Sequence, residues 1–355
     1  MAIVSSNFSQ SDSKGFKGKE RLVNPAEIAN ESNSLKEDSV RPKSFDDFMG
    51  QSGLKEVMSI STKAAISRSE ALDHVLLYGP PGLGKTTMAL ILANEMGVDC
   101  RISSAPALER PRDIVGLLLN LKPMGILFID EIHRLTKVAE ELLYPALEDF
   151  RLDLTVGQGT TARTRAIKLP RFTLVGATTR PASISSPLRD RFGITQRFEF
   201  YKLEELHQII NRTANYLELS LSNEASFEIA KRCRGTPRIA NRLLRRIRDF
   251  ALVQTNQNVI DLSLVVNSLQ LHKVDSCGLD NFDRKLLFML LNTNNGGPVG
   301  LDTLASALGE DAATLESVVE PFLLQIGFIK RTPRGRILTD QGKKHLMNEV
   351  DICQD

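Results

Sequence analysis

Short apolar runs alternate with segments of helical spacing over the first two thirds of the chain. The runs at His74–Tyr78, Ile126–Ile129 and Phe172–Val175 are almost entirely apolar. Compact runs of this kind are typical of strands covered on both faces, and their alternation with helices predicts a parallel sheet. We therefore expect an α/β large domain over residues 39–202.

After residue 202 the pattern changes to helices alone. Over residues 203–274, apolar positions such as Leu206, Ile209 and Ile210 repeat at the spacing of one buried helix face. An all-helical domain is expected there, and a turn around Asp275–Asp280 ends it.

The next unit, residues 275–347, combines helices with a basic hairpin. Helices are predicted at Phe282–Leu291, Leu301–Leu308 and Ala312–Ile326, followed by a strand-turn-strand at Phe328–Leu338. This unit has the size of a small independent domain.

The ends of the chain and its composition narrow the class of protein. Residues 1–38 are polar and lack apolar periodicity, so a largely disordered tail is predicted, and residues 348–355 are expected to form a short second tail. The 355 residues are 42% hydrophobic and 25% charged, as in soluble globular proteins, with 45 basic and 43 acidic side chains. Any basic surface for nucleic acid must therefore be local.

The cysteines and the apolar runs indicate the cellular compartment of the protein. Cys100, Cys233, Cys277 and Cys353 lie far apart, which favours reduced thiols over a zinc site or a disulfide scaffold. The longest apolar runs fall short of a membrane span, and the N-terminus lacks the pattern of a secretory signal. We expect a cytoplasmic protein.

The most specific motif is Gly79–Thr86, which matches G-x-x-x-x-G-K-[ST] at every position. A predicted strand precedes it and a helical segment follows, as a phosphate-binding loop requires. Its backbone N–H groups and the helix N-terminus would hold phosphate oxygens. Lys85 would reach the β- and γ-phosphates of ATP, and the Thr86 hydroxyl would bind Mg²⁺. A glycine turn that merely precedes a helix is a remote alternative.

Two carboxylates, Asp130 and Glu131, directly follow the buried run Ile126–Ile129. The carboxyl ends of strands in α/β sheets are where ligands bind. Asp130 is expected to hold Mg²⁺ and Glu131 to polarise the attacking water. An acidic strand end that caps the next helix is the alternative, which the neighbouring phosphate loop disfavours. His133 receives no role.

With these motifs the chain resembles the AAA+ ATPases and, among them, the RuvB family of Holliday junction branch migration motors. The resemblance covers about residues 40–345 and rests on further segments in each predicted domain. These segments are Asp130–Leu135, Gly176–Arg180, Pro187–Gly193, Gly235–Arg242 and Arg331–Arg336. The resemblance implies an AAA+ P-loop large domain with a parallel sheet, an all-α lid and a C-terminal winged helix.

The resemblance also implies roles for residues outside the phosphate loop. Thr178 is similar to the sensor of the γ-phosphate, although the neighbouring Thr179 stays open for that role. Arg191 is similar to the arginine finger that completes a neighbouring subunit's site, and Arg189 could share its work. A surface arginine paired with Asp190 is the alternative for both. Arg238 resembles the sensor of the lid.

Nucleotide contacts follow from the same family pattern. They are expected from the loop, the strand ends and the lid, namely at Val40, Arg41, Gly82, Gly84, Lys85, Thr86, Thr87, Glu148, Asp149, Phe150, Arg191, Tyr201 and Arg238. The catalytic group is expected to comprise Lys85, Glu131, Thr178 and Arg191, and the metal ligands Thr86 and Asp130. The basic run from Lys231 to Arg248 has one apolar helical face, which favours an interface over a DNA-binding helix.

Two hairpins are expected to contact partners. Residues Leu152–Leu169 alternate around glycines, which predicts a β-hairpin, and the resemblance implies that it docks the junction-binding protein RuvA. A passive surface loop without a partner is the local alternative.

In the winged helix, the hairpin carries Lys330, Arg331, Arg334 and Arg336 with no acid among them. It is expected to bind duplex DNA through phosphates, independently of sequence, although a solvated basic turn stays open.

The resemblance as a whole predicts a homo-hexameric, ATP-driven DNA translocase. With RuvA on a four-way junction it would drive branch migration in recombination and repair, and the resolvase RuvC is a further possible partner. A clamp-loader ATPase and a non-catalytic scaffold of the same fold are the alternatives. The first would end in a helical collar, and the second usually lacks one of the catalytic residues that are present here.

Overall fold

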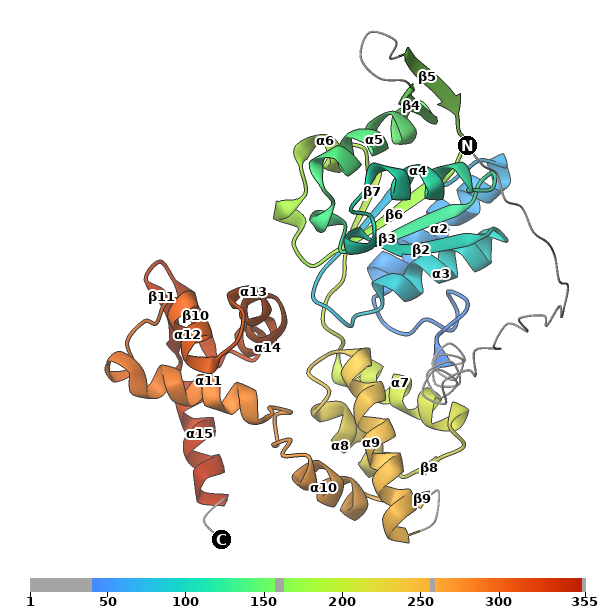
Figure 1. The fold of residues 1–355 in the computed structure, drawn as a ribbon. Helices are drawn as coiled ribbons and strands as arrows, with labels where there is room; N and C mark the ends of the chain where they lie inside the picture. Colours follow the sequence, from blue (N-terminus) through green and yellow to red (C-terminus); the bar gives the residue numbers. More distant parts are fainter. Residues whose placement is uncertain (1–39, 157–162, 256–258, 353–355) are drawn as a thin grey trace, which may run out of the picture. The chain divides into compact units, whose positions relative to one another are not determined.

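The computed structural model describes residues 40–156, 163–255 and 259–352 (Figure 1). The predicted tail at 1–38 lies outside these residues. The described residues from Pro42 onward belong to one compact unit. Within the described ranges, no helix is long and apolar enough to cross a membrane.

A five-stranded parallel sheet with the order β2-β3-β6-β1-β7 forms the centre of the large domain. Its strands are β1 (Val75–Tyr78), β2 (Cys100–Ser104), β3 (Ile126–Asp130), β6 (Thr173–Thr178) and β7 (Ile194–Arg197). The helices around it are α2 (Ser52–Arg68), α3 (Lys85–Met96), α4 (Pro111–Leu119), α5 (Lys137–Glu148) and α6 (Ser186–Arg189). The predicted α/β sheet is confirmed.

In each central strand, side chains point alternately to the two faces of the sheet, and this explains the uninterrupted apolar runs. Val75 and Leu77 of β1 join the apolar cluster that includes α2 and α3, whereas Leu76 joins the cluster that includes α4 and α5. Ile126 and Leu127 of β3 divide in the same way. Because successive side chains of a strand point to opposite faces, a sheet covered on both sides needs apolar residues at every position.

Two strands, β2 and β7, were not predicted from the sequence because they lie at the edges of the sheet. All residues of these two strands are partly exposed or exposed, and β2 carries Arg101 and two serines. An edge strand pairs on one side only and needs no continuous apolar run.

The helical domain contains α7 (Leu203–Tyr216), α8 (Asn223–Lys231), α9 (Pro237–Thr255) and α10 (Leu262–Leu271). The predicted apolar face of α7 is buried at Leu206, Ile209 and Ile210. The expectation of helices alone was wrong in one detail, since β8 (Ser220–Leu221) and β9 (Val259–Ile260) form a short parallel pair.

The last unit has its own apolar core. Its elements are α11 (Asn281–Asn292), α12 (Leu301–Leu308), α13 (Ala312–Thr314), a π-helical segment (Leu315–Val319), α14 (Glu320–Gln325), β10 (Ile329–Thr332), β11 (Gly335–Leu338) and α15 (Asp340–Ile352). The single helix predicted at Ala312–Ile326 is interrupted because Pro321 has no N–H to donate to the preceding turn. Helix α15 runs to Ile352, so the tail predicted at 348–355 is helical over most of its length.

Candidate functional site

The loop between β1 and α3 has a backbone that requires glycine. Gly79, Gly82 and Gly84 have φ of 142°, 81° and 105°, values that other residues rarely adopt. A Cβ on Gly79 would lie 2.6 Å from the Phe198 carbonyl oxygen, and one on Gly82 would lie 2.9 Å from Arg238 Cβ. The loop therefore fits closely between the residue that follows β7 and the first turn of α9.

Lys85, the first residue of α3, lies folded into this loop. Its Nζ donates to the carbonyl oxygens of Gly79 at 2.9 Å and Pro80 at 2.8 Å. Burial lowers the pKa of Lys85 to about 8, although the nearby Asp130 and Glu131 act to raise it. A desolvated amine at the start of a helix, held by carbonyl oxygens of the loop itself, is well placed to bind phosphate oxygens.

The two carboxylates lie where the sequence predicts, at the carboxyl end of β3. Asp130 ends the strand, and its Oδ1 accepts a hydrogen bond from the Glu131 N–H at 2.9 Å. Glu131 has a left-handed backbone with φ of 52°. That turn separates the directions of two consecutive acids, so they can serve different tasks.

Thr178 ends β6, the strand between β3 and β1. Its buried Oγ1 accepts a hydrogen bond from the Arg180 N–H at 2.9 Å and lies 2.8 Å from His133 Nδ1. His133 Nδ1 is also 3.4 Å from Glu131 Oε2. Burial lowers the pKa of His133, so its neutral ring can accept the Thr178 hydroxyl proton in a hydrogen bond.

His133 had no predicted role, and the structure places it between the predicted catalytic acid Glu131 and the predicted sensor Thr178. The residue comes from the short helix after β3, Ile132–Arg134. The available signal was its spacing of two residues from Glu131, and that spacing alone does not reveal a contact with β6.

Arg238 lies at the start of α9, against the phosphate loop. Its N–H donates to the Gly82 carbonyl oxygen at 3.3 Å. Tyr201 contacts the same loop, because its hydroxyl donates to the Leu83 carbonyl oxygen at 3.0 Å and its N–H donates to the Gly235 carbonyl oxygen at 2.9 Å. The segment that leads into α9 is thus hydrogen-bonded to residues around the predicted phosphate site.

Arg191 is held on its own chain by Glu148, the last residue of α5. Their Nη2 and Oε1 atoms are 3.0 Å apart, and the guanidinium lies 4.5 Å from the centre of the Tyr144 ring. The Glu148 side chain is 57% exposed. Arg189 donates instead to the carbonyl oxygens of Pro181 and Ile184. Arg191 and Glu148, predicted as separate nucleotide contacts, therefore form one pair.

In the winged-helix unit, the basic hairpin β10–β11 is less uniformly basic than its sequence indicates. Glu320 of α14 is buried and accepts from Arg331 Nη2 at 2.6 Å and from Arg336 Nε at 2.5 Å. Lys330 and Arg334 are exposed. The charge that faces solvent on this hairpin comes mainly from Lys330 and Arg334, because the exposed part of Arg331 is already paired with an acid.

The predicted hairpin of the large domain is also present. β4 (Arg151–Val156) pairs antiparallel with β5 (Arg163–Lys168), in a register that joins Arg151 to Lys168. The residues at 157–162 lie outside the described ranges. Figure 1 shows the two strands projecting beyond the sheet and α5.

The residues at the phosphate loop fit a magnesium nucleotide. A threonine hydroxyl and one carboxylate are hard oxygen ligands of the kind that Mg²⁺ takes together with phosphates and water. No group of three or more His, Cys, Asp or Glu that could hold a metal occurs in the described ranges.

Comparison with protein families assigns all three parts of the chain. Residues 40–198 match the Holliday junction DNA helicase RuvB P-loop domain, 201–275 the RuvB AAA lid domain and 276–347 the RuvB C-terminal winged helix domain. The chain belongs to the RuvB family. The resemblance inferred from its motifs is confirmed.

Relatives and solved structures agree with this assignment. A Holliday junction branch migration complex subunit RuvB from a strain of Prochlorococcus marinus is 69% identical over 98% of this chain and 97% of its own length. One from Synechococcus sp. (strain CC9311) is 64% identical over 98% and 97%. The structure of the Thermotoga maritima RuvB Holliday junction branch migration motor is 47% identical, with a TM-score of 0.80, covering 87% of this chain and 98% of that one.

Other nucleotide contacts expected of a RuvB-family chain stay predictions. Thr86 and Thr87 lie partly buried in the first turn of α3. The Phe150 ring packs against Phe172, with centroids 5.9 Å apart, and Asp149 lies 3.4 Å from the Arg151 side chain. Val40 and Arg41 precede the compact unit that begins at Pro42.

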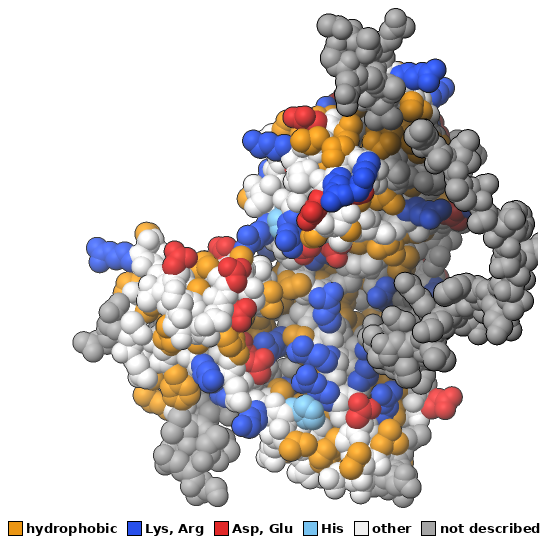
Figure 2. Space-filling view, viewed as in Figure 1, with side chains coloured by type: hydrophobic (Ala, Val, Ile, Leu, Met, Phe, Trp, Pro, Cys, Tyr) orange, Lys and Arg blue, Asp and Glu red, His pale blue; other side chains and the backbone are white. Residues whose placement is uncertain are grey.

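The basic run of this RuvB-family lid lies mainly on α9. Leu243, Leu244 and Ile247 are buried on one side, as predicted. Arg238, Arg242 and Arg246, four residues apart, are exposed on another side. Figure 2 shows Lys and Arg side chains gathered over the helices of the lid. Such a row is suited to an acidic or phosphate-bearing surface.

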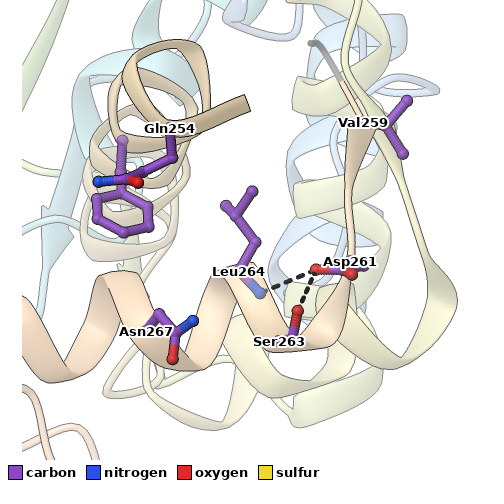
Figure 3. A pocket seen from close by; sticks show the side chains of 7 residues that line it. Gln254, Val259, Asp261, Ser263, Leu264 and Asn267 are labelled. Carbon is purple, nitrogen blue, oxygen red and sulfur yellow. Dashed lines mark hydrogen bonds between the residues drawn. The ribbon is translucent and has the colours of Figure 1, made fainter. Parts of the chain in front are cut away.

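A hollow of about 300 Å³ lies between the end of α9, β9 and α10 (Figure 3). Its lining residues include Phe250, Asp261 and Asn267, and none of the lining residues was predicted to bind nucleotide. Asp261 there caps α10 through the Leu264 N–H. The hollow therefore belongs to the packing of the lid rather than to the predicted site.

Glu320→Gln is expected to destabilise the winged helix by about 3 kcal/mol. The substitution removes the charged partner of Arg336, whose side chain is only 15% exposed. Urea unfolding monitored on the full chain measures the change. Glu310→Gln, at an exposed position of the same unit, is the matched control and should have little effect. Equal midpoints for the two variants would contradict the structural role of Glu320.

Proposed function

We propose that this protein is an ATP-driven DNA translocase that, as a ring of identical subunits with RuvA, migrates Holliday junctions. The observation that carries the proposal is an intact phosphate loop, paired carboxylates and Arg191 on a chain that belongs to the RuvB family throughout. The relatives named above are subunits of a Holliday junction branch migration complex.

Hydrolysis of ATP would use this chain's residues as follows. Lys85 exchanges the Gly79 and Pro80 carbonyl oxygens for phosphate oxygens, while the N–H groups of the loop hold the rest of the phosphate chain. Thr86 and Asp130 would hold Mg²⁺, which neutralises phosphate charge when bound. Glu131 orients the attacking water and accepts its proton.

The γ-phosphate would be detected by Thr178 on β6 and by Arg238 from the lid. The Thr178 hydroxyl accepts a hydrogen bond from the Arg180 N–H, and the Arg238 backbone N–H donates to the phosphate loop. A movement of either residue would therefore reach a different part of the chain. Arg191 would act on a neighbouring subunit's nucleotide, where a fixed guanidinium stabilises the spreading negative charge.

The requirement for a neighbour's arginine calls for contact between subunits, and we propose a hexameric ring because the chain belongs to the RuvB family. The exposed row Arg238, Arg242 and Arg246 is proposed to line an interface with the adjacent subunit. The β4–β5 hairpin is proposed to dock RuvA, and the resolvase RuvC to join the assembled complex. The winged-helix hairpin is proposed to hold duplex DNA.

The decisive experiment is ATP-dependent dissociation of a synthetic four-way junction, with and without RuvA. We expect junction movement that requires ATP and disappears in Lys85→Ala. RuvA should enhance this movement at low motor concentration. DNA-stimulated ATP hydrolysis with no junction movement under any of these conditions would refute branch migration and leave the ATPase.

DNA binding is expected to depend on salt through Lys330 and Arg334. Each phosphate contact contributes about 0.9 to the slope of log affinity against log salt, so Lys330→Ala with Arg334→Ala should lower the slope by about 2. Fluorescence anisotropy on duplexes of two unrelated sequences measures it. Lys285→Ala, at an exposed position of α11, is the control. An unchanged slope in the double variant would remove the hairpin from the DNA contact.

A further inference from the structure

Three side chains of the winged-helix unit form a row of thiol, imidazole and carboxylate that the proposed function does not use. The sulfur of Cys277 lies 3.7 Å from His345 Nδ1, and His345 Nε2 lies 3.0 Å from Asp275 Oδ2. A thiol and a base within contact distance, with a third group that orients the base, form an arrangement that activates a nucleophile.

The fold holds this row rigidly. Asp275 is 6% exposed, and its Oδ1 accepts hydrogen bonds from the N–H groups of Cys277 at 2.9 Å and Leu279 at 2.7 Å. The His345 ring, on α15, packs against Phe328 with centroids 4.9 Å apart. The imidazole is thus held between the carboxylate and the sulfur, with one ring nitrogen toward each.

The imidazole beside Cys277 carries a positive charge. The hydrogen bond to Asp275 is the main cause that raises the pKa of His345 to about 10, so the ring is positively charged at neutral pH. Burial acts to raise the pKa of Asp275, but hydrogen bonds from His345 and Leu279 bring it below its ordinary value. Arg284 lies 3.5 Å from the same carboxylate. A cationic N–H beside a sulfur stabilises the thiolate.

The described residues contain two other cysteines, whose surroundings differ. Cys100 is partly exposed, and burial raises the pKa of its thiol to about 11. Cys233 is fully buried, donates to the Ile229 carbonyl oxygen and has a pKa that burial raises. Cys277 is partly exposed and lies beside an imidazole, so it combines access with activation.

We propose that Cys277 is a redox-modification site that reacts with low-molecular-weight disulfides. The Cys277 thiolate attacks one sulfur of the disulfide, and a new S–S bond forms as the old one breaks. The second sulfur leaves with the electron pair and takes a proton from water, so one thiol is oxidised while half of the disulfide is reduced. Cys277 lies on the turn that joins the lid to the winged helix along the chain, so an adduct there would modify that connection.

The expected size of the effect follows from the contact between the sulfur and the imidazole. The thiolate is the form that attacks a disulfide, and an imidazole N–H beside the sulfur favours that form. A stabilised sulfur is also a weaker nucleophile, which offsets part of the gain. Cys277 should therefore react about ten times faster than N-acetylcysteine at pH 6.5.

The test treats the full chain with oxidised glutathione and follows each cysteine peptide by mass spectrometry. Wild type is compared with His345→Gln, and with His272→Gln, which removes a histidine whose ring contacts the Ser268 carbonyl oxygen. Cys277 should react about ten times more slowly in His345→Gln and unchanged in His272→Gln. An equal rate in His345→Gln would overturn the proposal.

A second measurement needs no variant and is independent of any folding defect. In the wild-type chain Cys277 should react at least about ten times faster than Cys100, which is also partly exposed but whose thiol pKa is raised by burial. Equal rates at Cys277 and Cys100 would refute an activated sulfur at this site.

Discussion

Arg191→Ala should lower kcat for ATP hydrolysis by a factor of about 10³ to 10⁵ while the chain still binds ATP. The guanidinium acts on charge that develops in the transition state, so its loss affects kcat more than nucleotide affinity. Hydrolysis is measured by phosphate release, and binding by a fluorescent ATP analogue. Because Glu148 is mostly exposed, loss of its ion pair with Arg191 should cost little stability.

Mixed rings decide whether Arg191 acts on its own subunit or on its neighbour. Lys85→Ala and Arg191→Ala should each be inactive, but a mixture should recover activity wherever an intact Lys85 meets an intact Arg191 across an interface. An arginine that acts within its own chain would give no recovery on mixing. Arg197→Ala, at an exposed position on β7, is the matched control and should retain activity.

The phosphate loop was predictable because its requirements are local. Gly79, Gly82 and Gly84 are needed by the backbone of one turn, and Lys85 contacts residues five and six positions earlier. A motif of eight residues contains all of this information. The positions of the central strands were likewise accessible, since buried strands have continuous apolar runs.

Contacts between distant segments were not predictable in this way. Glu320 neutralises Arg331 and Arg336 from 11 and 16 residues away, so a hairpin with no acid in its own sequence still has a buried acidic partner. His133 meets Thr178 across 45 residues because β3 and β6 are neighbours in the sheet. Both contacts depend on packing that residue spacing does not reveal.

Arg191 illustrates a third case, in which neither the local sequence nor the structure of a single chain is sufficient to assign the role of a residue. Its role was inferred from resemblance, and within one chain it pairs with Glu148 on the same subunit. We expect the guanidinium to leave this pair when a neighbour's nucleotide approaches, because a phosphate carries more charge than an exposed carboxylate. The mixed-ring experiment tests that exchange of partners.

Glu131→Gln is expected to lower kcat by a factor of about 10² to 10⁴ and to leave ATP bound. The amide keeps the size of the side chain and can still orient water, but it cannot accept a proton. Its neighbour provides a sharp comparison, because Asp130→Asn should weaken Mg²⁺-dependent ATP binding itself. The variants are compared by single-turnover hydrolysis and by nucleotide titration with and without Mg²⁺.

The separation of these two effects follows from the geometry at the end of β3. Asp130 continues the strand and accepts from the Glu131 N–H, whereas Glu131 turns away through a left-handed backbone toward His133. If both variants lost ATP binding equally, the two carboxylates would act together on the metal and Glu131 would not be the base. If Glu131→Gln hydrolysed ATP at the wild-type rate, the proton acceptor would have to be a different group.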